Sequence, residues 1–288
     1  MLKINHYLSL VKFSHTIFAL PFACIGFTLA IKSGVSLETK KITLLFVLVI
    51  ACMVFARSAA MAFNRFIDRD FDALNPRTAV REIPAGIINP KNALFFIIIN
   101  CLLFVIATWF ISPICFYLSP VALFTILFYS YTKRFTPLCH LVLGVGLALA
   151  PIGSYLAITG QFAWLPLLFS FTVFCWVSGF DIIYALQDED FDRKNKLKSI
   201  PVLLGTKGAL VFSKMLHALA FCFIVSAGFL GHFNWLYWIG AYLFSLLLVH
   251  QHSLVKPTDL TKINIAFFTT NGIASVVFAL FTIISLFI

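Results

Sequence analysis

The stretch TLLFVLVIACMVFARSAAMAFNRFIDRDFD at positions 43–72 decides the fold class, because an apolar run leads directly into a cluster of acids. About 20 apolar residues are needed to cross the roughly 30 Å of hydrocarbon in a bilayer, and residues 43–66 are long enough to do so. Arg57 is the only charged residue between positions 43 and 64. The stretch therefore predicts a membrane helix that ends in a charged segment.

The composition extends this prediction to the whole chain. Hydrophobic residues make up 61% of the 288 residues and charged residues only 11%, whereas a soluble domain has about one quarter charged residues. We expect an all-α integral membrane protein with one domain, 1–288, built as a bundle of nine transmembrane helices. The expected spans are 16–33, 43–66, 91–111, 114–131, 137–158, 162–184, 208–230, 234–252 and 264–287. The first carries His15 and Pro21 near its start and no small-residue cleavage site, so we expect a retained helix and not a signal peptide.

The net charge of +10 is best explained by membrane orientation and not by a nucleic-acid partner, because the basic residues lie in short connections between spans. The connections after the second, fourth, sixth and eighth spans hold most Lys and Arg, which places them in the cytoplasm by the positive-inside rule. Lys32, Lys40 and Lys41 run against this topology. We expect a bacterial inner (cytoplasmic) membrane protein whose charged loops face the cytoplasm.

Acidic residues are concentrated in two regions. Eight of the eleven acids lie within 68–72 and 181–192, in the loops near 65–90 and 186–207 or in the helix leading into the second: Asp68, Asp70, Asp72, Asp181, Asp188, Glu189, Asp190 and Asp192. The segments NRFIDRDFD at 64–72 and YALQDEDFD at 184–192 have similar endings and lie 120 residues apart in the sequence. This similarity suggests a pseudo-repeat, with one copy after the second span and one after the sixth.

The spacing of these residues points to a metal site. Asn64, Asp68 and Asp72 are four residues apart, and Asp181, Asp188 and Asp192 follow at steps of seven and four, so a helix would place each set on one face. Carboxylates on one face repel each other, and oxygen ligands favour a hard cation such as Mg²⁺, which also binds phosphate oxygens. Two such ions could clamp a diphosphate and favour its departure. The alternative is that the acids only pair with basic residues of their own loops.

Basic residues near the same end could complete a phosphate site. They are Arg65, Arg69, Arg77, Arg81, Lys133, Arg134, Lys196 and Lys198. Arginine suits bidentate phosphate contacts, although cytoplasmic loops are basic in any case. Arg57 is a stronger candidate, because a charge inside a span is costly and usually functional. It could neutralise the carboxylate of an acceptor or pair with an Asp of its own cluster.

The sequence also resembles a known family. The stretch RSAAMAFNRFIDRDFDALNPRTAVREIPAG at 57–86 is similar to the first signature of the UbiA superfamily of intramembrane prenyltransferases. DIIYALQDEDFDRKNKLKS at 181–199 resembles the second signature, and YSYTKRFT at 129–136 resembles the family's short basic motif. Nine spans are the family's architecture. Arg65 departs from the familiar pattern, in which Asp follows the Asn that Asn64 matches.

This resemblance implies specific roles. Magnesium, the expected cofactor, would be held through Asn64, Asp68, Asp72, Asp188 and Asp192, with Asp181 close by. The carboxylates of Asp68, Asp72, Asp188 and Asp192 would assist ionisation of a polyprenyl diphosphate. Diphosphate contacts would come from Lys133, Arg134 and Lys198, while Arg57 would lie on the acceptor side and Tyr184 at the motif tyrosine. Phenylalanine is abundant, with 34 residues, and aromatic faces can stabilise an allylic cation.

The acceptor is open between two aromatic classes. Arg65 after Asn64, together with HTIFALPF at 15–22, resembles a 4-hydroxybenzoate polyprenyltransferase-like subgroup, which implies a step in ubiquinone synthesis. Some members of that subgroup are associated with the futalosine route to menaquinone, which implies a naphthoate-type acceptor. A function of another class is an ion-coupled membrane transporter, but transporters place charged sites near the bilayer midplane, whereas these acids lie where spans end.

Overall fold

The computed structural model of the protein describes residues 2–11 and 18–288, so His15 and positions 16–17 of the expected first span lie outside the described residues. The regular elements in these ranges are helical. They are α1 (Leu2–Leu10), α2 (Leu20–Lys32), α3 (Thr39–Ile67), α4 (Arg69–Leu74), α5 (Pro90–Ile111), α6 (Pro113–Thr132), α7 (Cys139–Thr159), α8 (Trp164–Ala185), η2 (Leu186–Asp188), α9 (Glu189–Lys194), α10 (Ile200–Leu230), α11 (Trp235–Leu254), η3 (Ile265–Thr270) and α12 (Asn271–Ser285).

Local sequence signals begin and end several of these helices. Asn89 precedes Pro90, and its side chain accepts a hydrogen bond from the backbone N–H of Lys91 at 2.9 Å. Ser112 before Pro113 caps α6 in the same way. Such caps satisfy the free N–H groups of a first turn, and proline at the first position has no N–H to satisfy. α7 ends at Gly160, whose φ of 65° is the left-handed conformation that glycine adopts easily.

The expected spans coincide with helices, but their number as membrane spans is not confirmed. Seven helices of the described chain are long and apolar enough to cross a membrane. α2 has only 13 residues, and α11 carries His250, Gln251 and His252 near its end and is not among the seven. α10 is interrupted at Gly205 (φ 66°, ψ 170°), so its long part begins close to the expected start at 208, and Ser199 caps the short helical segment before the interruption.

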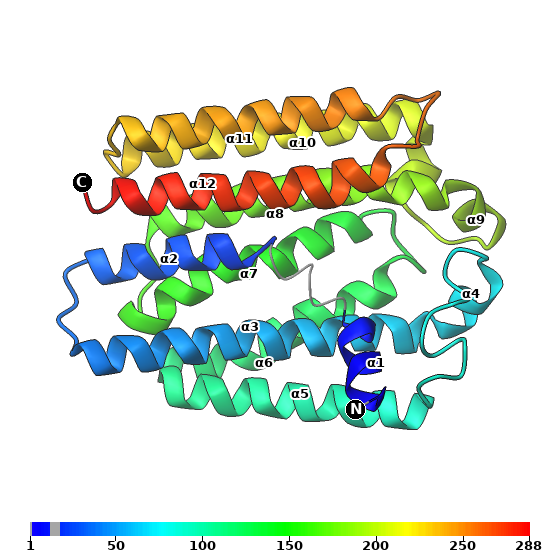
Figure 1. Cartoon of the computed structure of the whole chain (residues 1–288), viewed down its shortest axis with the longest axis horizontal. Helices are drawn as coiled ribbons and strands as arrows, with labels where there is room; N and C mark the ends of the chain where they lie inside the picture. Colours follow the sequence, from blue (N-terminus) through cyan, green and yellow to red (C-terminus); the bar gives the residue numbers. More distant parts are fainter. Residues whose placement is uncertain (1, 12–17) are drawn as a thin grey trace.

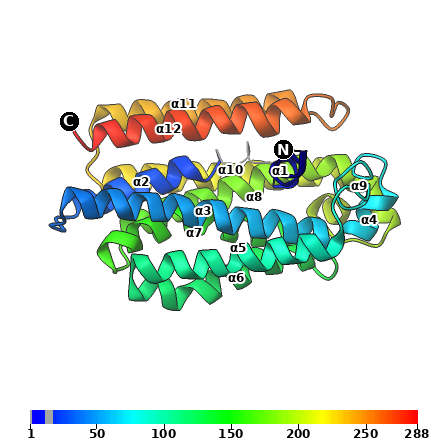
Figure 2. The same ribbon diagram turned by 60° about the horizontal axis from the view of Figure 1, so that its bottom comes forward.

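The long helices lie alongside one another, and the short helices α4 and α9 come together at one end of the bundle (Figures 1 and 2). α8 lies at the centre, packed against α7 and α10, and α3 packs against α5. The main core surrounds the fully buried Trp176 of α8. α2 and α7 approach so closely that a Cβ at Gly26 would overlap the carbonyl oxygen of Pro151. The two acidic motifs, 64–72 and 184–192, thus meet at the end that carries α4 and α9.

Candidate functional site

Both acidic motifs lie where a long helix breaks. α3 ends at Ile67, Asp68 has φ −91° and ψ 5°, and α4 starts at Arg69. In the second motif α8 ends before the short η2, Asp188 has φ −106° and ψ 3°, and α9 starts at Glu189. The first aspartate of each motif therefore has nearly the same backbone conformation at equivalent breaks.

Neither motif lies on one continuous helix, because the chain leaves the α conformation at Asp68 and Asp188. Four-residue hydrogen bonds nevertheless continue across the first break: Asp68 N–H donates to Asn64 O at 2.9 Å, and Asp72 N–H donates to Asp68 O at 2.7 Å. The stacking of Asn64, Asp68 and Asp72 predicted from their spacing is thus preserved locally. α4 and α9 then carry Asp72 and Asp192 into the interior, where both are buried.

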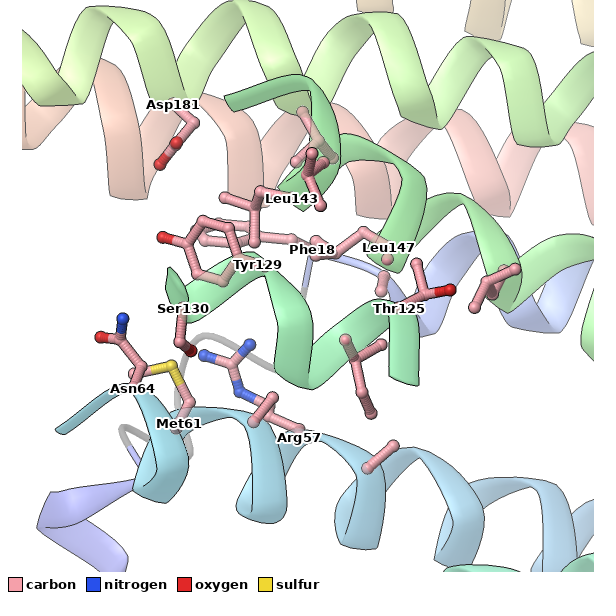
Figure 3. A pocket seen from close by; sticks show the side chains of 18 of the residues that line it. Phe18, Arg57, Met61, Asn64, Thr125, Tyr129, Ser130, Leu143, Leu147 and Asp181 are labelled. Carbon is pink, nitrogen blue, oxygen red and sulfur yellow. The ribbon is translucent and has the colours of Figure 1, made fainter. Parts of the chain in front are cut away.

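The two motifs line one cavity of about 660 Å³. Figure 3 shows Asn64, Tyr129 and Asp181 around it. Its polar end is formed by Asn64, Asp68, Asp72, Asp181, Asp188 and Asp192, with Arg57, Arg65, Arg77, Arg81, Lys133, Arg134, Tyr129, His140 and Tyr184. Its apolar arm includes Val49, Cys52, Phe104, Ile111, Leu118, Ala157 and Phe162. Along α3 the lining runs from Arg65 back to Val49, so the cavity continues from the charged end far into the bundle.

Arginines neutralise part of the first motif. Arg81 Nη1 lies 2.6 Å from Asp72 Oδ1, and Arg134 Nη2 lies 3.4 Å from Asp68 Oδ1. The amide of Asn64 donates to Asp68 Oδ2 at 3.0 Å. Arg134 also donates to the carbonyl oxygen of Ile67 at 2.8 Å, which fixes it against the helix break.

Bases from other parts of the chain hold the second motif. Arg77, in the loop after the first motif, contacts both oxygens of Asp188, with Nη2 at 2.9 Å from Oδ1 and 2.6 Å from Oδ2. The Nδ2 group of Asn75 donates to the same carboxylate at 3.3 Å. Lys133, directly after α6, lies 2.7 Å from Asp192 Oδ1. These contacts tie the first loop and the end of α6 to the second motif.

The electrostatics of this end favour a further cation. Burial raises the pKa of Asp68 and the nearby carboxylate of Asp72 raises it further, while Lys133 and Arg134 act in the opposite direction. Burial would lower the pKa of Lys133, but the adjacent carboxylate of Asp192 outweighs this effect, so the pKa of Lys133 is raised. Burial and the Asp72 charge together therefore outweigh the two bases, so the ionised Asp68 carboxylate would be stabilised by a further cation.

The donor set fits magnesium bound together with a phosphate ligand. Asp72 Oδ2 and Asp192 Oδ2 are buried and have no hydrogen-bond partner among the described residues, although the other oxygen of each carboxylate is paired. Within the described chain, no group of three or more His, Cys, Asp and Glu residues is arranged to hold a metal by itself. Mg²⁺ commonly takes one or two carboxylates and completes its shell with water and substrate phosphate, which matches this arrangement.

The remaining expected residues divide into two groups. Arg57 projects from α3 into the cavity toward Ser130 of α6 (Figure 3), and Tyr184 lines the same cavity. Lys198 is not among the lining residues: its backbone N–H donates to Lys133 O at 2.7 Å and its Nζ donates to Phe135 O at 3.1 Å. Its expected diphosphate contact stays a prediction. Arg69 and Lys196 also lie outside the lining.

Two features of the site were missed from sequence. His140, at the start of α7, places Nδ1 2.7 Å from Asp181 Oδ2. A buried histidine at the end of a membrane helix could have been noted as an ionisable residue within a span, but its partner is 41 residues away in the sequence. Phe267 lines the cavity as one of 34 phenylalanines, and composition alone could not single it out.

Comparison with known proteins identifies the family. Residues 19–273 match the UbiA prenyltransferase family. The chain is 29% identical over 226 residues to a protein named 4-hydroxybenzoate octaprenyltransferase from Francisella tularensis subsp. novicida, covering 78% of this chain and 79% of that protein. It is also 29% identical over 223 residues to a protein of the same name from Tolumonas auensis, covering 77% and 78%.

Solved structures give the same result. A UbiA homolog from Aeropyrum pernix, in its apo form, superposes with a TM-score of 0.83 at 30% identity, covering 94% of this chain and 97% of that one. A UbiA homolog from Archaeoglobus fulgidus bound to DMAPP and Mg²⁺ has the same fold, with a TM-score of 0.74 at 22% identity over 98% and 99% of the two chains. The chain belongs to the UbiA prenyltransferase family and is an integral membrane prenyltransferase.

Proposed function

We propose that the protein transfers a polyprenyl group from polyprenyl diphosphate to a 4-hydroxybenzoate-like aromatic acceptor in a magnesium-dependent reaction of quinone biosynthesis. One observation carries this proposal: two buried carboxylates, Asp72 and Asp192, line the charged end of a cavity that is otherwise largely apolar, and each has one oxygen without a described hydrogen-bond partner. A charged end suits a diphosphate, and the long apolar arm suits an isoprenoid tail.

The chain's own residues would hold the donor. Asp68, Asp72, Asp188 and Asp192 would bind magnesium with Asn64, and Asp181 would remain engaged by His140 nearby. Bound magnesium would neutralise the diphosphate and favour its departure as an anion. Lys133 and Arg134 already lie beside carboxylates at this end and would add charge-assisted contacts to phosphate oxygens. Lys198 would reach the diphosphate by leaving the carbonyl of Phe135.

The acceptor would enter on the Arg57 side of the cavity. A guanidinium in a membrane-spanning helix can neutralise a carboxylate, which both benzoate and naphthoate acceptors carry. The names of the Francisella and Tolumonas relatives favour 4-hydroxybenzoate, and the naphthoate-type acceptor of the futalosine route is the second candidate. Attack by the ring carbon and loss of its proton would complete the transfer.

The membrane arrangement belongs to the same proposal. All nine expected spans would cross the bilayer within one domain, the first of them including α2. The ends of α3, α6 and α8, which carry the charged site, would face the cytoplasm, because the loops that follow them are basic. Reporter fusions at Ala79 and Gly160 would test this: the first should report a cytoplasmic position and the second an external one.

The decisive assay uses detergent-purified protein, Mg²⁺, labelled prenyl diphosphate and a panel of 4-hydroxybenzoate, dihydroxynaphthoate and futalosine-derived acceptors, with products identified by mass spectrometry. Asp68→Ala and Asp192→Ala should each abolish magnesium-dependent transfer while the protein stays folded. Asp70→Ala and Asp190→Ala are matched controls, because both acids belong to the same motifs but are exposed and outside the cavity lining. Wild-type rates in either cavity variant would reject the mechanism.

A transporter would behave differently in the same preparation. Substrate-dependent uptake into liposomes, with no diphosphate released on addition of prenyl diphosphate, would support transport and reject the proposed enzyme.

A further inference from the structure

Four aromatic rings form one wall of the cavity near its charged end. We call Phe18, Phe180, Tyr184 and Phe267 the aromatic wall; all four line the cavity. Phe267 is the ring that contacts each of the others, with centroids 4.1 Å from Tyr184, 5.2 Å from Phe180 and 5.6 Å from Phe18. Its position is therefore fixed from three directions.

Phe267 lies in a segment with an unusual backbone conformation. Ile265–Thr270 form a π-helix, η3, directly before α12. π-Helical turns are rare, their backbone pattern interrupts the regular α-helix, and they occur often at functional sites. This turn places Phe267 in the cavity lining, whereas its neighbour Phe268 is not among the lining residues.

Three fully buried polar side chains from three helices hold the π-helix. Asn271 of α12 donates from Nδ2 to Phe267 O at 2.9 Å and to Ala266 O at 3.2 Å. Gln251 of α11 donates to the same Ala266 carbonyl at 3.0 Å, and Trp176 of α8 donates from Nε1 to Asn271 Oδ1 at 2.9 Å. A buried network of this kind fixes the backbone conformation, because leaving any member unpaired is costly. Apolar side chains would fill the same space without fixing these carbonyls.

The aromatic wall adjoins the diphosphate end through Tyr184. The guanidinium carbon of Arg77 lies 5.9 Å from the centre of the Tyr184 ring, and the same guanidinium holds both oxygens of Asp188. Phe180 and Tyr184 flank Asp181 along α8. A prenyl diphosphate with its phosphates among the carboxylates would therefore have its first carbons beside these rings.

We propose that Phe267 is a catalytic residue that stabilises the allylic cation, and that Asn271 is the residue that positions it. This inference rests on the proposed function. In the transfer step, the bond between C1 of the prenyl chain and the diphosphate oxygen breaks, and both electrons leave with diphosphate. The positive charge spreads over C1 and C3, and the π-face of Phe267 attracts it. The acceptor ring carbon then donates an electron pair to C1, and the proton on that carbon leaves to water.

The test replaces Phe267 in the full-length protein by mono-, di- and trifluorophenylalanine. Fluorine withdraws electron density from the ring face with little change in shape, so the fold is maintained. We expect the single-turnover rate at saturating donor and acceptor to fall with each fluorine, reaching a loss of about 30-fold for the trifluoro ring, the size of a cation–π attraction at a desolvated site. Fluorination of Phe268, in the same π-helix but outside the lining, should leave the rate unchanged.

Asn271→Leu removes the donors to the π-helix at nearly constant volume. We expect a lower transfer rate and a weaker dependence of that rate on the number of fluorines at position 267, because the ring is no longer held against the substrate. If Asn271 had a purely structural role, the dependence on fluorination would be unchanged. A flat fluorination series in an active wild-type background overturns the role of Phe267 and leaves the proposed function intact. A wild-type protein without transfer activity overturns the proposed function itself.

Discussion

Replacing Lys133 by Met should show how much the stability of the protein depends on the one positive charge that pairs with Asp192 in the second acidic motif. The Nζ group of Lys133 lies 2.7 Å from Asp192 Oδ1, the Asp192 side chain is 1% exposed, and that of Lys133 is 31% exposed. Removing one partner of a fully buried pair costs about 3–5 kcal/mol. Because water reaches Lys133, we expect a loss of about 2–3 kcal/mol, near the lower limit for buried pairs.

That loss should be visible as a fall of about 6–9 °C in the thermal unfolding midpoint in detergent, at roughly 3 °C per kcal/mol for a chain of this size. The double variant Lys133→Met/Asp192→Asn leaves no unpaired charge and should recover most of the loss. Mg²⁺ with a non-hydrolysable prenyl diphosphate analogue should stabilise Lys133→Met more than wild type, because the metal replaces the missing positive charge beside Asp192.

Lys194→Met is the matched control. Because Lys194 is exposed on α9, this substitution should change the free energy of unfolding by less than about 0.5 kcal/mol. The reasoning is refuted if Lys133→Met unfolds at the wild-type temperature, or if the double variant loses as much as the two single variants added together. Either result would mean that the Asp192 carboxylate is not a buried charge that requires a partner.

Three further predictions concern other contacts. Arg77→Lys removes the bidentate contact with the Asp188 carboxylate. It should raise the Mg²⁺ concentration for half-maximal activity by about 10–100-fold, because a group that orients a metal ligand is lost. An unchanged magnesium titration would contradict this. Glu189→Gln weakens the contact that holds α9 to the Thr206 hydroxyl of α10 and the pair with Arg193 within α9, each at 2.9 Å, and should lower the free energy of unfolding by about 1–2 kcal/mol in thermal unfolding. Gly26→Ala should cost about 1–3 kcal/mol because its Cβ overlaps the Pro151 carbonyl, whereas Gly153→Ala, with nothing within 4 Å, should be nearly neutral in the same measurement.

Helix positions could be predicted well because each apolar run must bury its backbone hydrogen bonds within one segment. The predicted span 91–111 corresponds to α5 at Pro90–Ile111, and 137–158 corresponds to α7 at Cys139–Thr159. The short segment of α10 before Gly205 was missed, since a capped segment with a glycine bend does not differ from a loop in hydropathy. The exact break at Asp68 could not be read from the spacing of the acids, because that spacing is helical and the hydrogen bonds on either side of the break remain helical.

Most of the charged residues that line the cavity could also be predicted to lie together, since they are few and clustered in the sequence, but their pairing could not. Repeated spacing brought Asp68, Asp72, Asp188 and Asp192 into one hypothesis, and the structure places all four around one cavity. Which base meets which acid depends on how the helices pack. The contacts of Arg77 with Asp188 and of His140 with Asp181 join residues 111 and 41 positions apart.

The two acidic motifs have matching backbones but different partners, and this difference explains how the site is held together. Asp72 is paired within its own loop by Arg81, nine residues later, whereas Asp192 is paired from outside by Lys133. The residue after Lys133, Arg134, turns to the first motif and contacts Asp68. Two consecutive bases at the end of α6 therefore connect both motifs, and a change in the angle of α6 would move both acids together. Because α6 also lines the apolar arm of the cavity, a prenyl tail in that arm that shifted α6 would also shift the two bases that hold Asp68 and Asp192.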